Sequence, residues 1–189
     1  MFIADGRIQD VTPSSHAASS TANVIDLAGA FVLPGLWDVH THIGRGIPDI
    51  EARDEPIAER TIRAGQNCID ALNLGITGIR VVGEKEFIDV AWKRAFDSGQ
   101  FVGPSLFTCG YFITTTAGHF LKSGCAIEVD GPDEYRRVIR EQIKNGVDFI
   151  KLNLTGGVMG RRGIRWPTRF RCLTSWKQRS SCVTAVASR

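Results

Sequence analysis

Two histidines spaced for metal binding stand in the segment Leu36-Trp37-Asp38-Val39-His40-Thr41-His42. Side chains two residues apart on a β-strand point the same way, so a strand here would aim the imidazoles of His40 and His42 at one spot. Neutral imidazole is a good ligand for Zn²⁺ and similar cations. The alternative is that they are two surface histidines at a strand end. Taken alone, the pair indicates half of a metal site.

Alternating strands and helices are expected to position this pair. The patterns predict strands at 36–42, 78–82, 105–108 and 148–154, separated by helices at 56–74, 85–98 and 132–145. In the first helix, Ile62, Ile69 and Leu72 are expected to share one face. Strands joined by helices pair in parallel. Four such units fit either half of a (β/α)₈ barrel or an open doubly wound sheet, and no G-x-G-x-x-G follows a strand to favour the second.

Residues 1–34 have a different pattern, typical of an antiparallel β module. Strands are predicted at 2–4 and 7–8 around Asp5-Gly6, and at 24–27 and 31–33 around Ala28-Gly29. A polar loop that contains His16 separates the two pairs, and Pro34-Gly35 ends the module. Such a module is too small to stand alone.

Four stretches carry a family resemblance: residues 33–42, 75–80, 115–119, and 146–152 followed by Thr155-Gly156-Gly157. In this order they resemble the amidohydrolase superfamily, in particular its imidazolonepropionase-like and prolidase-like members. The resemblance implies an α/β fold: part of an N-terminal β-sandwich at 1–34, then the first four βα units of a TIM (β/α)₈ barrel at 35–160. Residues 161–189 lie outside the resemblance.

The resemblance also implies a metal site. His40 and His42 match the first-strand ligands of the more buried ion, and Lys151 matches the lysine that many members carbamylate so that it bridges two metals. The implied cofactor is one or two divalent cations, with Zn²⁺ the first choice. A carbamate is an anionic ligand, whereas an ammonium would repel a cation. Without the resemblance, Lys151 reads as a surface lysine with its charge in solvent.

His119 matches a glycine-histidine stretch at the active-site mouth of related enzymes, which implies contact with substrate. The alternative is a loop histidine without a role. Asp38 is expected to orient the first-strand turn or to support a histidine. Arg80, in the second strand, is expected inside the barrel beside a carboxylate of the protein or of the substrate, because a buried unpaired cation is costly.

The implied activity is hydrolysis of an amide, cyclic amide or dipeptide C–N bond by metal-activated water. Complete members also use histidines from the fifth and sixth strands and an aspartate from the eighth. A barrel takes about 250 residues, whereas residues 36–189 number 154. We therefore expect an N-terminal fragment that has no catalytic general base of its own and is inactive alone.

The charge distribution sets residues 161–189 apart. They hold seven Arg, one Lys and no acid, so their net charge is +8. The whole chain has a net charge of +3, which leaves −5 on residues 1–160. One interpretation is a sequence read out of frame near Gly160 and not part of the fold. The other makes the chain a non-catalytic fragment whose basic tail binds nucleic acid or an acidic partner. The absence of any recognised binding motif favours the first.

Five widely spaced cysteines without a C-x-x-C pair argue against a disulfide framework and for a reducing compartment. The N-terminus lacks the basic start and apolar core of a secretion signal, so a cytoplasmic location is expected. No apolar run approaches the ~18 residues of a membrane span. The expected partner is a small amide or dipeptide substrate, and assembly into a homo-oligomer stays open.

Overall fold

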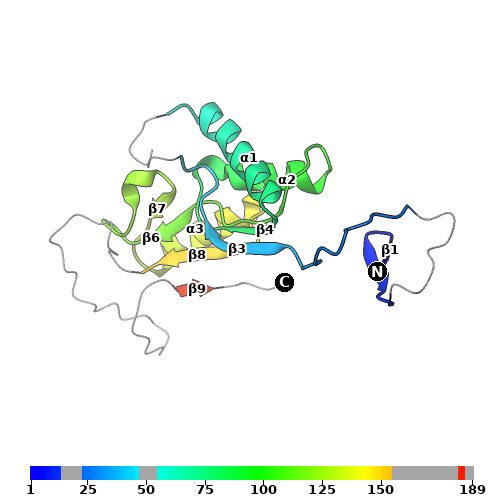
Figure 1. The fold of residues 1–189 in the computed structure, drawn as a ribbon. Helices are drawn as coiled ribbons and strands as arrows, with labels where there is room; N and C mark the ends of the chain where they lie inside the picture. The colour runs from blue at the N-terminus through cyan, green and yellow to red at the C-terminus, as the bar shows by residue number, and fades with distance from the viewer. Residues whose placement is uncertain (14–22, 47–54, 155–182, 186–189) are drawn as a thin grey trace. The chain divides into compact units, whose positions relative to one another are not determined.

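The computed structural model describes residues 1–13, 23–46, 55–154 and 183–185 (Figure 1). It divides into two compact units, Met1–Pro34 and Gly35–Arg189. In the first unit, β1 (Phe2–Ala4) and β2 (Arg7–Asp10) form the predicted antiparallel hairpin. Asp5 and Gly6 between them have φ of 52° and 69°. Positive φ at both positions is what a two-residue hairpin turn of type I′ requires.

The two further strands predicted for the first unit, at 24–27 and 31–33, are wrong: the described residues there pair with no strand. Ile25 is 83% exposed and Phe31 is 95% exposed. The turn between them is present, because the N–H of Ala28 donates to Oδ1 of Asp26 at 2.8 Å. A strand needs a partner for its backbone groups, and the described part of this unit supplies none.

The second unit is α/β with parallel sheets. Strand β3 (Leu36–Thr41) pairs in parallel with β4 (Ile76–Val81), which pairs in parallel with β5 (Ser105–Phe107). Helix α1 (Ile57–Asn73) connects the first two strands, and α2 (Ile88–Asp97) connects the second and third. These elements confirm the predicted order of strand and helix.

A second sheet has the order β7-β6-β8-β9. Its parallel strands are β6 (Phe112–Thr114), β7 (Ala126–Glu128) and β8 (Ile150–Asn153), and β9 (Val183–Ala185) runs antiparallel to β8. The carbonyl of Thr108, just after β5, accepts the N–H groups of Asp148 at 2.8 Å and Phe149 at 3.3 Å. The chain leading into β8 therefore lies beside the end of β5, which links the two sheets.

Helix α3 (Pro132–Asn145) has the predicted bounds. Pro132 occupies the first turn, where its missing N–H costs no hydrogen bond. Gly146 ends the helix with φ of 90°, a left-handed conformation that glycine adopts without strain. Local sequence alone is enough to set both ends of this helix.

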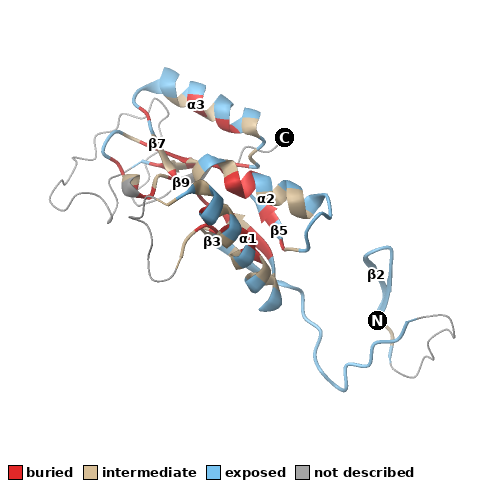
Figure 2. Cartoon of the chain, turned by 90° about the horizontal axis from the view of Figure 1, so that it is seen from above, coloured by how far each residue is buried: buried red, intermediate tan, exposed pale blue. Residues whose placement is uncertain are grey.

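The three helices pack on one face of the strands, and Figure 2 shows them following one another across the sheet. Ile79, Val81 and Leu106 pack with α1 and α2 in one core cluster. Ile113 and Ile150 pack with Val138 of α3 in another. The alternate residues point to the opposite face, where the guanidinium of Arg80 lies 4.1 Å from the ring centre of Phe149. That opposite face carries the polar groups described below.

Two details of the helices differ from what the patterns suggest. Ile62 is 71% exposed, so the face that it shares with Ile69 and Leu72 is not the most buried one; the fully buried residues of α1 are Arg60, Ala64, Gly65 and Cys68. The second helix begins as a separate 3₁₀ turn, η1 (Lys85–Phe87), because Glu86 and Phe87 have positive φ. A further 3₁₀ turn, η2 (Leu121–Ser123), precedes β7.

His16 and most of residues 161–189 lie outside the described residues, so the two interpretations of the basic tail stay predictions. Cys68, Cys109 and Cys125 are buried and free. Within the described ranges, no helix combines the length and apolar character needed to cross a membrane.

Asp89 of α2 is a fully buried carboxylate whose Oδ2 accepts the N–H of Gly110 at 2.9 Å. Burial raises the pKa of Asp89 to about 6, and the nearby charge of Glu84 adds to the rise. An unfolded aspartate titrates near ~3.9. The folded state thus holds this proton more tightly, and its stability falls as the pH rises from about 4 to about 6.

Asp89→Asn is expected to remove this pH dependence, because the amide keeps an acceptor oxygen and does not ionise. Relative to the wild type, the free energy of unfolding of the variant should rise by about 2–3 kcal/mol between pH ~4 and pH ~7. Urea unfolding of both proteins across this range measures the difference. A difference that stays constant with pH would show that Asp89 does not titrate there.

Candidate functional site

The four residues predicted from the sequence to form the site line one pocket of the second unit, about 820 Å³ in volume. Its walls come from β3, β4, β6, β8, helix α1 and the segments that follow β3 and β6. The polar and aromatic lining includes Asp38, His40, His42, Arg45, Phe112, His119, Phe120, Lys151 and Asn153. Parallel strands with their carboxyl ends at one edge bring these distant residues together.

His40 and His42 face this pocket as neighbours, with ring centres 6.2 Å apart and planes at 71°. Nδ1 of His42 lies 2.7 Å from the carbonyl oxygen of Gly83. A carbonyl only accepts, so Nδ1 carries the proton and Nε2 of the neutral ring keeps its lone pair. His42 is therefore set up as an Nε2 ligand.

Both imidazoles are disposed to be neutral. Burial lowers the pKa of His42 to about 4, and the positive charge of Lys151 contributes. The pKa of His40 is also lowered, first by partial burial and then by the charges of Lys151 and Arg80. Neutral rings are the form that binds a cation.

Lys151 lies within β8 and is only 6% exposed. Its Nζ is 5.6 Å from the ring centre of Phe112, on the pocket side of the sheet. A buried lysine on this face is not the solvent-directed surface lysine that was the alternative. Within the described residues, no group of three His, Cys, Asp or Glu side chains is arranged to hold a metal. The two imidazoles fit a cation, whereas Lys151 fits one only without its positive charge.

His119 reaches the pocket through an aromatic stack. Its ring stacks on Phe120 with centres 5.5 Å apart, and Phe120 packs against His42 at 5.9 Å. The guanidinium of Arg45 lies 5.4 Å from the same phenyl ring. His119 is thus separated from the histidine pair by the ring of Phe120.

Asp38 bonds the backbone of its own strand, as the first of its two expected roles requires, whereas Arg80 has partners that were not expected. Oδ1 of Asp38 accepts the backbone N–H of His40 at 3.0 Å, so Asp38 orients the strand and not an imidazole. Arg80 donates to the carbonyl of Val39 at 3.3 Å and lies over Phe149. Among the described residues its partners are thus a carbonyl and an aromatic ring, and no protein carboxylate pairs with it; the alternative, a carboxylate of the substrate, stays a prediction. The π-face of Phe149 stabilises the cation instead.

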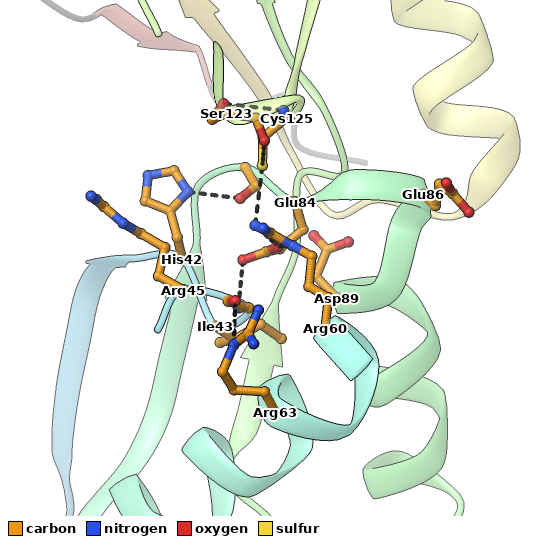
Figure 3. Close-up of polar contacts among 12 residues, drawn as sticks. His42, Ile43, Arg45, Arg60, Arg63, Glu84, Glu86, Asp89, Ser123 and Cys125 are labelled. Carbon is orange, nitrogen blue, oxygen red and sulfur yellow. Dashed lines mark hydrogen bonds and ion pairs between the residues drawn. The ribbon is translucent and has the colours of Figure 1, made fainter. Parts of the chain in front are cut away.

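A buried ion pair beneath the pocket was not predicted. Oε2 of Glu84 accepts from Arg60 at 2.9 Å (Nη2) and 3.2 Å (Nε), and neither residue is more than 6% exposed (Figure 3). Oε1 of Glu84 accepts the N–H of Gly44 at 2.8 Å. The available signal was an acid just after Gly83 at the carboxyl end of a strand, where site residues of βα units gather.

Helix α1 holds the same segment from the other side. Nδ2 of Asn67 donates to the carbonyls of Ile43 at 2.7 Å and Arg45 at 2.9 Å. Arg63 donates to the carbonyl of Gly44 at 3.0 Å and pairs with Glu55. The residues that follow His42 are therefore fixed by several side chains and not left as a loose loop.

Comparison with known proteins gives consistent matches. The profile of the Amidohydrolase family matches residues 31–171, beyond residue 160 where the sequence motifs end. Ochratoxinase of Aspergillus niger is 29% identical over 157 residues, covering 69% of this chain and 32% of the relative.

Two solved structures are also similar. A Xaa-Pro dipeptidase with bound methionine in the active site is 30% identical with a TM-score of 0.58, covering 67% of this chain and 35% of that one. A prolidase complexed with N-methylphosphonate-L-proline is 26% identical with a TM-score of 0.63, covering 72% and 37%. The chain spans about a third of the length of these relatives.

Proposed function

This chain belongs to the amidohydrolase family, and from that premise we propose that it forms part of a metal-dependent hydrolase of amide or dipeptide bonds. The observation that carries the proposal is the meeting of His40, His42 and Lys151 in one pocket. The relatives named above include a dipeptidase and a prolidase, which supports amide bonds as the substrate.

The fold supports the proposal that residues 35–160 are the first four βα units of a (β/α)₈ barrel. A doubly wound sheet carries helices on both faces, whereas α1, α2 and α3 pack on one. The opposite face would then be the barrel interior, and the pocket would lie at the carboxyl ends of the strands, as in barrel enzymes. The hairpin β1–β2 would belong to a flanking β-sandwich.

In the proposed mechanism, His40 and His42 would hold the cation through neutral nitrogens. When bound, a divalent cation such as Zn²⁺ would polarise the amide carbonyl and make water acidic enough to attack near neutral pH. The ring of Phe120 shields His42 on one side, and His119 at the pocket wall would contact the substrate. Asp38 is the one carboxylate that the described residues contribute to this pocket, and it bonds the backbone of His40. We propose that the proton acceptor comes from outside this chain.

Metal titration tests this proposal. The chain should bind Zn²⁺ or Co²⁺ in calorimetry and, for Co²⁺, show an absorption spectrum of nitrogen ligation, while dipeptides and acyl-amino acids are hydrolysed no faster than by a His40→Ala control. Failure of both metals to bind would contradict the metal site. Turnover well above the control would contradict the external proton acceptor.

Lys151 is proposed to complete the site as a carbamate. After Nζ loses its ammonium proton, its lone pair attacks the carbon of CO₂; the N–C bond forms, a second proton leaves to solvent, and the product carries one negative charge. This change replaces a repelling cation with a bidentate oxygen ligand on a buried stem. It needs CO₂ and nothing else from solution.

Bicarbonate is therefore expected to strengthen metal binding by the wild type, and Lys151→Met should bind weakly with or without it. Lys151→Glu, which supplies a carboxylate directly, should bind without any bicarbonate effect. A carbamate resonance in ¹³C NMR with labelled bicarbonate, absent from Lys151→Met, gives a readout that is independent of activity. Equal metal affinity in all three proteins would exclude Lys151 as a ligand.

A further inference from the structure

We infer that Glu84 is a positioning residue for His42: together with Gly83 it fixes the tautomer and the orientation of the imidazole. The inference rests on the proposed metal site for its purpose, but its geometry stands by itself. Glu84 is fully buried, and its carboxylate is occupied by Gly44 and Arg60. It therefore acts through other residues and is not itself a ligand.

The first contact is made by the backbone of Gly83. Its carbonyl receives the Nδ1 proton of His42 at 2.7 Å. Gly83 has φ of 148°, and a Cβ at this position would lie 2.6 Å from Cδ1 of Phe112 and 3.2 Å from Cε1 of His42. Only glycine allows the backbone to approach the rings of Phe112 and His42 this closely. The close packing of Gly83 therefore fixes its carbonyl next to Nδ1 of His42.

The second contact is made by the carboxylate of Glu84. It accepts the N–H of Gly44, two residues beyond His42 in the chain. A Cβ on Gly44 would lie 2.7 Å from Nε of Arg60 and 2.8 Å from Oε2 of Glu84, so the ion pair presses directly against this backbone. The charge of Arg60 in turn favours the ionised form of this carboxylate, against the effect of burial.

The third contact holds the Gly83-Glu84 pair itself. The N–H of Glu84 donates to the carbonyl of Gly110 at 2.8 Å. The dipeptide Gly83-Glu84 is thereby held by Gly110, which follows β5. It accepts a hydrogen bond from the ring of His42 through Gly83 and one from the N–H of Gly44 through Glu84 (Figure 3). If the carboxylate is lost, Asn67 and Arg63 still hold the carbonyls of residues 43–45, but the N–H of Gly44 loses its acceptor, and we expect the segment to shift enough to weaken the Nδ1 bond of His42.

Two charge-neutral double variants separate this role from simple stability. Arg60→Met with Glu84→Gln removes both charges but keeps an acceptor for Gly44, whereas Arg60→Met with Glu84→Leu removes the acceptor at similar volume. Asp89→Asn is the control: it neutralises an equally buried carboxylate, and its amide oxygen keeps an acceptor for the N–H of Gly110. Imidazole ¹⁵N NMR of the metal-free proteins, at about pH 8 where histidine is neutral, reports the tautomer. Zn²⁺ titration reports affinity.

The wild type, Asp89→Asn and the Gln double variant should show His42 protonated at Nδ1 alone. The Leu double variant should show both tautomers and bind Zn²⁺ about 10- to 100-fold more weakly, the usual loss when a ligand's supporting group is removed. A mixture of tautomers in the wild type, or a single tautomer in the Leu variant, would overturn the inference. If the tautomers behave as expected but no protein binds Zn²⁺, the positioning role stands and the proposed metal site fails.

Discussion

Alanine at both His40 and His42 is expected to eliminate divalent cation binding, with a loss of affinity greater than about 100-fold. Removal of a group that only supports a ligand costs about 10- to 100-fold, and this variant removes two proposed ligands. What remains is Lys151, whose ammonium repels a cation unless it is carbamylated. Calorimetry with Zn²⁺, and metal analysis after dialysis, measure the loss.

The single variants should differ from each other. His42 is half-buried and its Nε2 is fixed by the bond to Gly83, whereas His40 is exposed. His42→Ala should therefore weaken binding more than His40→Ala, since a fixed ligand has less freedom to lose on binding. His16→Ala changes a histidine that no proposal uses and serves as the control. Undiminished binding by the double variant would place the metal elsewhere in the chain.

The parts of the fold that the sequence predicts well depend on local rules. Pro132 and Gly146 mark the ends of α3, and Asp5-Gly6 marks the hairpin, because each residue type has a backbone preference of its own. The prediction of strands at 24–27 and 31–33 was wrong because strand formation is not a local property. Their apolar residues are suited to a sheet, but whether a strand forms depends on a partner that local sequence does not reveal.

The site shows the same division. The two-residue spacing of His40 and His42 predicts that they share a direction, because strand geometry alone requires it. The group that fixes His42 is a backbone carbonyl, and a carbonyl has no sequence signal. Arg60 and Glu84 are 24 positions apart and both read as surface residues. Only the packing of α1 against the end of β4 reveals that they form a buried pair.

Arg60→Met is expected to destabilise the chain by about 3–5 kcal/mol at neutral pH, the usual cost of leaving one charge of a buried pair uncompensated. Glu84 is fully buried, and hydrogen bonds from the backbone of Gly44 and Lys85 do not replace the charge of the guanidinium. Urea unfolding, with equal slopes for variant and wild type, measures the change. Adding Glu84→Gln should recover most of it, because the charge that lacks a partner is then gone.

The pH dependence distinguishes a lost ion pair from lost packing. Burial already raises the pKa of Glu84, against the lowering effect of Arg60, so removing Arg60 raises that pKa further. A carboxyl with a raised folded-state pKa costs stability above that pKa and regains it as the pH falls toward the unfolded value of ~4.3. The deficit of Arg60→Met should therefore shrink at acid pH, while that of Arg60→Met with Glu84→Gln stays constant. If Arg60→Met lowers the free energy of unfolding equally at neutral and at acid pH, the arginine stabilises the fold through its packed side chain and not through its charge.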